Sequence, residues 1–394
     1  MSAHRPVPLA PHLAAIAGQP YPRFSDAEFA RRRALLREAM GRAGVDTVLV
    51  CGENRAGPAV GWLTGWPTTA EAVVVFDGTR RDMLFIQYHN HVPLGARLAR
   101  DAEVRWGGPQ TVDAVMEELR KRGAKRVGVM GPLAMGKQKK LAAAVELVDM
   151  GAAYVAMRLV KSHEEADWAR IGAWLSDRAV HALLEEVRPG ITERDLWRIC
   201  ENAYQGEGGT TWIHYFGTTP MAAPEVYVPA QYPSTRRIAA GDLVFTEISA
   251  MFWDYPGQVL RTFVVAAEPT PLYRDLHATA QAALDAVLAQ VRAGATTQAL
   301  VDASACIEEA GFTTCDDLVH GFVGGYLPPV LGSRSRPAGP LPDTTLEAGM
   351  MIVVQPNVIT TAHRAGVQVG ELVLVTEDGY ERLHAAPAGL MRIG

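Results

Sequence analysis

The fold of this chain is decided by the stretch Gly241–Thr262, which reads GDLVFTEISAMFWDYPGQVLRT. Its apolar run Leu243–Ser249 predicts a buried strand, and Glu247 lies within that run. An ionised carboxylate among apolar side chains is costly unless it is paired or hydrogen-bonded. Desolvation would raise the pKa of Glu247 into the range that suits a general base or acid. The alternative is a structural carboxylate that pairs with Arg261.

The pattern around this stretch indicates two domains. Residues 156–394 begin with long amphipathic helices and turn strand-rich from Thr211, which predicts an α+β domain. Residues 1–155 alternate helical and strand patterns, which predicts a smaller α/β domain. The main expected strands are Thr47–Val50, Glu71–Phe76, Asp82–Gln87, Arg126–Val129, Trp212–Phe216, Leu243–Ser249, Phe263–Ala266, Met351–Val354 and Glu371–Thr376, with helices at Leu272–Ala293 and Thr297–Ala310 between the later strands.

The composition is that of an ordinary globular protein. The chain has 394 residues, of which 48% are hydrophobic and 21% are charged, and its net charge is −5. No basic run suggests nucleic acid, and no apolar run reaches the roughly 18–20 residues of a membrane span. Four dispersed cysteines and the absence of a signal-peptide pattern predict a cytoplasmic protein.

Three later stretches matter together with Gly241–Thr262, because all four resemble segments of one known family. They are Leu318–Leu327 (LVHGFVGGYL), Leu346–Val358 (LEAGMMIVVQPNV) and Gly366–Gly379 (GVQVGELVLVTEDG). In order and spacing, the four stretches resemble the core segments of the creatinase/aminopeptidase P/prolidase family. The resemblance implies an α+β fold, with a pita-bread C-terminal domain preceded by a smaller α/β creatinase-type N-terminal domain.

The resemblance departs from the family at its metal site. Metal-dependent members supply two Asp, one His and two Glu to a pair of metal ions. The matching positions here hold Glu247, Gln258, Gly324, Gln355 and Gly370. Glycine offers no side chain, and glutamine offers a neutral carbonyl where carboxylates would bridge two cations. We therefore expect no metal and no other cofactor, as in the metal-free branch that includes creatinase and ectoine hydrolase.

Several other residues are candidates for the site. His320, in a Gly-rich loop, and His214, on a predicted strand, could act as acid, although each could equally be a core histidine. Gln258 and Gln355, with Gln368 beside them, could bind a polar substrate or only fill the vacated space with hydrogen bonds. The remaining candidates for substrate binding are Arg55, Tyr255, Arg261 and Glu371, for which a surface loop, core packing or an ion pair are the alternatives.

These observations predict a metal-independent hydrolase of creatinase-like type. Its substrate would be a small polar C–N compound: an amide, lactam, cyclic amidine, guanidino or carbamoyl compound. Glu247 would be the base, and His320 or His214 would protonate the leaving nitrogen. Two alternatives stay open: a lyase or isomerase, and a catalytically silent binding or regulatory protein. The resemblance also implies a homodimer in which residues around Asn54–Trp66, including Arg55, complete the partner's site; we expect neither nucleic acid nor membrane as a partner.

Overall fold

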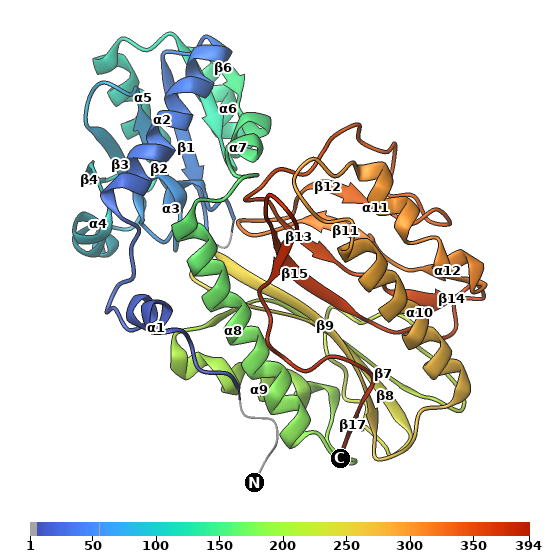
Figure 1. The fold of residues 1–394 in the computed structure, drawn as a ribbon. Helices are drawn as coiled ribbons and strands as arrows, with labels where there is room; N and C mark the ends of the chain where they lie inside the picture. The colour runs from blue at the N-terminus through green and yellow to red at the C-terminus, as the bar shows by residue number, and fades with distance from the viewer. Residues whose placement is uncertain (1–5, 55) are drawn as a thin grey trace. The chain divides into compact units, whose positions relative to one another are not determined.

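The computed structural model describes residues 6–54 and 56–394. The chain divides into two compact units, which are described separately (Figure 1). One unit comprises Gln19–Arg158, and the other comprises Leu159–Gly394 together with residues 6–18. No helix among the described residues is long and apolar enough to cross a membrane.

The unit Gln19–Arg158 is built on a mixed sheet with strand order β4-β3-β2-β1-β5-β6. Alternate residues of β1 contribute to two separate hydrophobic clusters, with Val48 and Val50 in one and Leu49 and Cys51 in the other. Both faces of the sheet are therefore buried, which explains the unbroken apolar runs of its strands. Its elements are α2 (Asp26–Ala43), β1 (Thr47–Gly52), α3 (Ala59–Thr64), β2 (Ala72–Phe76), β3 (Asp82–Ile86), η1 (His89–His91), α4 (Val92–Leu98), β4 (Ala102–Trp106), α5 (Thr111–Arg122), β5 (Arg126–Met130), α6 (Met135–Ala142), β6 (Glu146–Asp149) and α7 (Gly151–Met157).

The larger unit is built on a mainly antiparallel sheet with strand order β12-β11-β13-β15-β9-β8-β7. β16 pairs with β15, β17 pairs in parallel with β9, and β10 and β14 form a separate small ladder. Its strands are β7 (Thr210–Pro220), β8 (Asp242–Phe252), β9 (Tyr255–Val265), β10 (Phe312–Thr314), β11 (Val319–Gly321), β12 (Leu327–Leu331), β13 (Met351–Val354), β14 (Val358–Thr360), β15 (Gly370–Val375), β16 (Tyr380–Arg382) and β17 (Met391–Ile393). Its helices are α1 (Pro11–Ala17), α8 (His163–Glu186), α9 (Glu193–Tyr204), η2 (Gln205–Glu207), α10 (Pro271–Leu288), α11 (Thr297–Ala303) and α12 (Cys306–Glu309).

The predicted α+β fold is confirmed, with local differences. The expected strand Phe263–Ala266 is the end of the longer β9, and the expected helix Leu272–Ala293 ends at Leu288 as α10. The expected helix Thr297–Ala310 is broken into α11 and α12, where the hydroxyl of Ser304 donates to the carbonyl of Val301 at 2.8 Å. Such a bond from a serine side chain to the backbone carbonyl three residues earlier competes with continuation of the helix.

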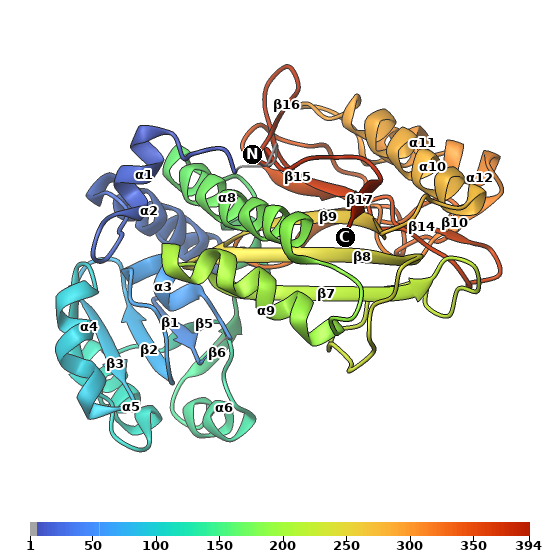
Figure 2. The same ribbon diagram turned by 90° about the horizontal axis from the view of Figure 1, so that it is seen from below.

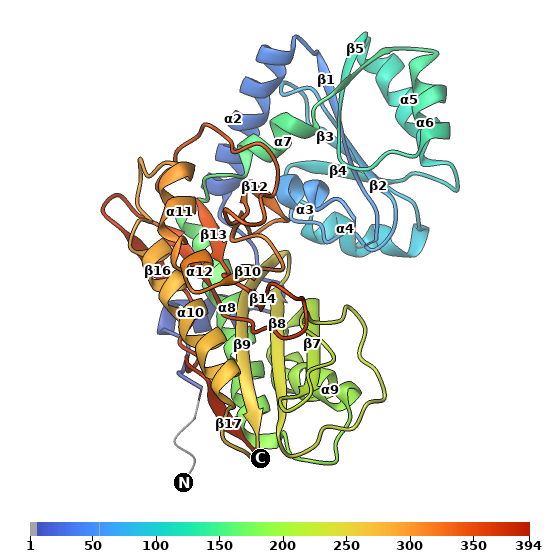
Figure 3. The same cartoon turned by 90° about the vertical axis from the view of Figure 1, so that its right-hand side faces the viewer.

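The stretch Gly241–Thr262 lies in the β8–β9 hairpin, and α8 covers one face of this hairpin. Figure 2 shows α8 and α9 along β7, β8 and β9, and Figure 3 shows the three strands side by side. A Cβ placed on Gly257 would lie 2.2 Å from Cα of Ala173, so only glycine permits this close approach of helix and strand. The hydroxyl of Ser176 donates to the carbonyl of Gly257 at 2.6 Å. Gly257 therefore faces α8, and its neighbour Gln258 faces the other side of the sheet.

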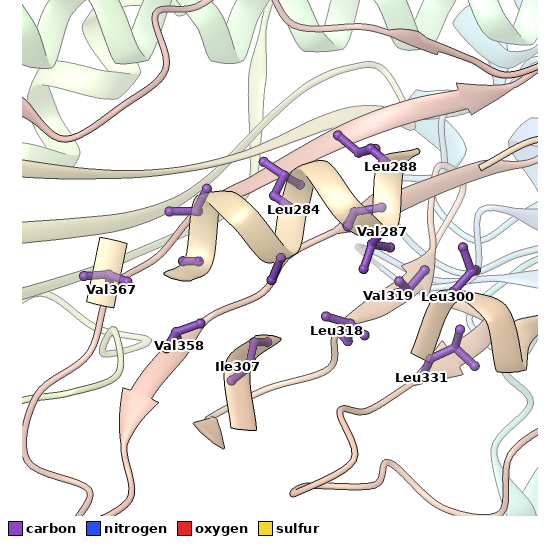
Figure 4. Packing of buried hydrophobic residues seen from close by; sticks show 14 of the residues in the cluster. Leu284, Val287, Leu288, Leu300, Ile307, Leu318, Val319, Leu331, Val358 and Val367 are labelled. Atoms are coloured by element: carbon purple, nitrogen blue, oxygen red, sulfur yellow. The ribbon is translucent and has the colours of Figure 1, made fainter. Parts of the chain in front are cut away.

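The second half of the sheet is covered by α10. Leu284, Val287 and Leu288 of this helix belong to one buried cluster with Val358 and Val367 (Figure 4). Because side chains alternate along an extended chain, residues next to Val358 and Val367 face away from α10. The face of the sheet away from α8 is the one on which Glu247 and Gln258 lie.

Candidate functional site

Glu247 lies in the middle of β8, on the face opposite α8. It pairs with Leu260 of β9, while the neighbouring pair is formed by Ser249 and Gln258. The Glu247 side chain is buried, and its Oε1 accepts a hydrogen bond of 2.8 Å from Gln258 Nε2. Burial, followed by the negative charge of Asp316, raises the pKa of Glu247 to about 8. At neutral pH this carboxyl is therefore mainly protonated.

A chain of hydrogen bonds extends from Glu247 across the sheet. Gln258 Nε2 also donates to Gln355 Oε1 at 3.0 Å. The side chain of Gln355 in turn acts on His320, whose pKa it raises slightly against the larger effect of burial. Both hydrogens of the Gln258 amide are therefore used, and both partners are oxygens that accept, which fixes the orientation of this amide. Four of the residues selected from the sequence thus lie together. They are Glu247 from β8, Gln258 from β9, His320 from β11 and Gln355 from the segment after β13.

His320 lies beside Gln355, beyond these hydrogen bonds. Its Nδ1 lies 3.1 Å from the carbonyl oxygen of Gly321, and because a carbonyl can only accept, Nδ1 carries a proton. The ring stacks on Tyr326 with 4.6 Å between centroids. Burial lowers the pKa of His320, although its bond to Gly321 opposes this shift. The neutral ring therefore leaves Nε2 unprotonated and able to accept a proton.

His214 does not join this group. It pairs with Ile248, whose side chain lies on the other face from Glu247. His214 Nε2 is hydrogen-bonded to the hydroxyl of Tyr204, on α9, at 2.7 Å. Burial lowers the pKa of His214 to about 3, so the ring is neutral and part of the core. The residue opposite Glu247 is instead Tyr215, whose pKa is raised by burial and then by Glu247; the sequence analysis missed it, although it is the neighbour of His214.

Arg261, Glu371 and Tyr255 also lie away from Glu247, contrary to the expected grouping. Arg261 Nη2 lies 2.8 Å from Glu371 Oε1, so the partner of Arg261 is Glu371 and not Glu247. Tyr255 donates to Glu165 of α8 at 3.0 Å. The physical reason is the two-residue period of the strand, which turns Tyr255, Gly257 and Arg261 to the face that α8 covers. These are structural contacts of the helix-covered face.

Arg55 is outside the described residues. Its predicted contact with a partner's site, like the predicted homodimer, stays a prediction.

The side chains present do not fit a two-metal centre. Among the described residues, no group of three or more His, Cys, Asp and Glu side chains is arranged to hold a metal ion. A Cβ on Gly370 would lie 2.7 Å from Cδ1 of Leu260 and 3.0 Å from Cβ of Gln355, so the space beside Gly370 is filled by these side chains. Gly324 supplies no ligand, and the imidazole that lies near Glu247, Gln258 and Gln355 is that of His320. A single carboxylate, a histidine and two amides cannot replace the anionic ligands that bridge two divalent ions.

Comparisons with known proteins place this geometry in a family. Residues 168–377 match the model of metallopeptidase family M24, and residues 32–160 match the creatinase/prolidase N-terminal domain. The chain is 27% identical over 229 residues to the Xaa-Pro dipeptidase of Pyrococcus furiosus, a match that covers 58% of this chain and 63% of that protein. It thus spans slightly less than two thirds of this curated relative. It is 26% identical over 398 residues to an uncharacterized hydrolase/peptidase of Sinorhizobium fredii, covering 93% and 97% of the two chains.

Solved structures support the same fold. The Xaa-Pro dipeptidase from Bacillus anthracis superposes with a TM-score of 0.80 at 22% identity, covering 93% of this chain and 100% of that chain. The prolidase from Pyrococcus furiosus superposes with a TM-score of 0.75 at 20% identity, covering 89% and 99%.

These comparisons correct the predicted function. The relatives are named as Xaa-Pro dipeptidases and prolidases, not as hydrolases of small C–N compounds. The predicted metal-independent, creatinase-like hydrolase is therefore wrong, and neither the lyase or isomerase nor the silent binding protein is favoured. The broader prediction of an enzyme is supported, because the family is one of hydrolytic peptidases. With its family matches covering most of both units, the chain belongs to metallopeptidase family M24, of the creatinase/aminopeptidase P/prolidase type.

Proposed function

We propose that this chain is a hydrolase of peptide bonds in short peptides, and that Xaa-Pro dipeptides are its substrate class. The observation that carries the proposal is a buried acid, Glu247, hydrogen-bonded through Gln258 to Gln355, with the neutral His320 beside Gln355. The names of the relatives support the choice of substrate class.

Peptide hydrolysis requires a base that activates water and an acid that protonates the leaving nitrogen. A peptide nitrogen, including the proline nitrogen of an Xaa–Pro bond, leaves as a neutral amine only when a proton is supplied. Glu247, with its pKa raised to about 8, holds such a proton at neutral pH. His320, with its pKa lowered by burial, offers Nε2 as the base. These roles are the reverse of those expected from the sequence, where Glu247 was the base.

In the proposed reaction, a water oxygen bonds to the carbonyl carbon while His320 takes a proton from that water. The C–N bond then breaks, and the proton of Glu247 passes to the proline nitrogen. Exchange with solvent returns a proton to Glu247 and removes one from His320. No step is assigned to a metal ion, because the side chains present do not fit the family's two-metal centre.

The test is the release of proline from Ala-Pro by the purified chain, compared with cleavage of Ala-Ala. Each reaction is run once with a chelator and once with added Mn²⁺. The double variant Glu247→Gln/His320→Gln, purified in parallel, reports any contaminating peptidase. We expect proline release by the wild-type chain, faster than cleavage of Ala-Ala, and none by the double variant. The absence of proline release in both buffers, or equal release by the double variant, would overturn the proposal.

A further inference from the structure

Two further amide side chains are buried in the larger unit with polar atoms left unsatisfied. Asn357 is 0% exposed and Gln368 is 1% exposed. Among the described residues, neither amide atom of Asn357 has a hydrogen-bond partner, and the same is true of Gln368 Oε1. Leaving a buried donor or acceptor unpaired costs about 1–3 kcal/mol per group, so such groups call for an explanation.

Strand register places these amides side by side. Val354 pairs with Glu371, and Ile359 forms a bridge with Gly366. The same register, counted between these pairs, sets Gln355 opposite Gly370 and Asn357 opposite Gln368. The backbone carbonyl of Asn357 accepts from the amide of Cys315 at 3.1 Å, and Gln368 Nε2 lies 3.8 Å from Cys315 Sγ.

The face of the sheet on which they lie is that of the Glu247 chain. Their neighbours Val358 and Val367 enter the core under α10 (Figure 4). Because side chains alternate along an extended chain, we infer that Asn357 and Gln368 face away from that helix. Gln355, two residues before Asn357, already belongs to the hydrogen-bonded chain. The unpaired amides therefore adjoin the proposed reaction site.

The charges around this face favour a nitrogen ligand. The carboxyls of Asp316 and Asp317 act on His320, and that of Asp316 also acts on Glu247. One basic side chain, the exposed Arg336, acts on Asp316 and Cys315. The two carboxyls of Asp316 and Asp317 therefore act on Glu247 and His320 with one exposed guanidinium opposing them, and this arrangement favours an ammonium group over a carboxylate. An ammonium group donates three hydrogen bonds, and the amide oxygens of Asn357 and Gln368 are free to accept.

We propose that Asn357 and Gln368 form a subsite for the free α-amino group of the substrate. This inference rests on the proposed peptide hydrolysis. It selects peptides with an unblocked N-terminus, and it accounts for two buried amides whose oxygens have no partner within the described part of the protein.

The test measures binding separately from cleavage. In a Glu247→Gln background, calorimetry at pH 6.5 compares Ala-Pro, whose amino group is charged, with N-acetyl-Ala-Pro. We expect Ala-Pro to bind at least 10-fold more tightly. Asn357→Leu and Gln368→Met should each weaken Ala-Pro binding about 10- to 100-fold, the loss expected for a hydrogen bond to a charged group, and leave the acetylated peptide unaffected.

Thermal denaturation of the same variants separates a binding role from a structural one. Removal of an unpaired buried amide should leave the melting temperature unchanged or raise it. The control is Tyr273→Phe, which removes an unpaired buried hydroxyl in the core under α10 and should change neither peptide's binding. Equal binding of Ala-Pro and N-acetyl-Ala-Pro would overturn the subsite. So would variants Asn357→Leu and Gln368→Met that lose stability but still prefer Ala-Pro over the acetylated peptide. Selective binding without proline release would instead overturn the proposed function alone.

Discussion

The substitution Glu247→Gln should change how the stability of this protein depends on pH. The pKa of Glu247 is about 8 in the folded chain against 4.5 for an ordinary glutamate, the value we take for the unfolded chain. Between these two values the folded state holds a proton that the unfolded state has lost, so the free energy of unfolding falls as pH rises. One unit of pKa difference corresponds to 1.36 kcal/mol, which gives about 5 kcal/mol in total. Glutamine is neutral throughout and lacks this dependence.

The measurement is urea unfolding of the wild-type chain and Glu247→Gln at intervals from pH 5 to pH 9. The difference between their free energies of unfolding cancels the titration of groups that both chains share. The free energy of unfolding of the variant should rise steadily relative to that of the wild type up to about pH 8. Above that pH the difference should stay constant. Because the glutamine introduced by the substitution can still accept from Gln258, the two chains should have similar stability near pH 5.

A difference that changes by less than about 1 kcal/mol across this range would refute the reasoning, since one unit of pKa shift already corresponds to more than that. It would mean that Glu247 titrates as an ordinary, ionised glutamate. The carboxyl would then be unable to hold a proton for the leaving nitrogen at neutral pH.

Two further substitutions test the assignment of residues to the helix-covered face. Glu371→Gln leaves the buried Arg261 without its counter-charge and should lower the free energy of unfolding by about 3–5 kcal/mol in urea unfolding; a loss below about 1 kcal/mol would contradict the buried ion pair. Tyr204→Phe removes the partner of the buried His214 and should cost about 1–3 kcal/mol while the rate of Ala-Pro cleavage stays within about twofold of wild type; a rate about 10-fold slower would place His214 in the site.

The sequence predicted the strands well because their apolar runs are long and bounded by turns. Residues 243–249 fall within β8 and residues 351–354 form β13, as expected. The structure also brings together Glu247, Gln258, Gln355 and His320, which were selected because they lie on segments whose order resembles a known family. Their hydrogen-bonding order was not predicted, since it depends on strand register.

The sequence could not show which face of each strand a helix covers. Along β9, Gln258 and Arg261 are three residues apart and therefore lie on opposite faces, but either face could have been the site. The close contact between Ala173 of α8 and Gly257 settles the choice, and this contact joins segments far apart in the chain. Asn357 was not among the residues selected from the sequence, because its unpaired amide becomes visible only through burial.

The rate of proline release from Ala-Pro by Glu247→Gln, relative to the wild-type chain at pH 7, tests the central claim most directly. Glutamine keeps the shape and the hydrogen bond from Gln258, but it cannot give a proton to the leaving nitrogen. The rate should therefore fall about 10²- to 10⁴-fold, the range typical of general acid catalysis, with the melting temperature retained. The matched control is Glu268→Gln, an exposed carboxylate, which should behave as wild type. Release of proline by Glu247→Gln at the wild-type rate would contradict the account.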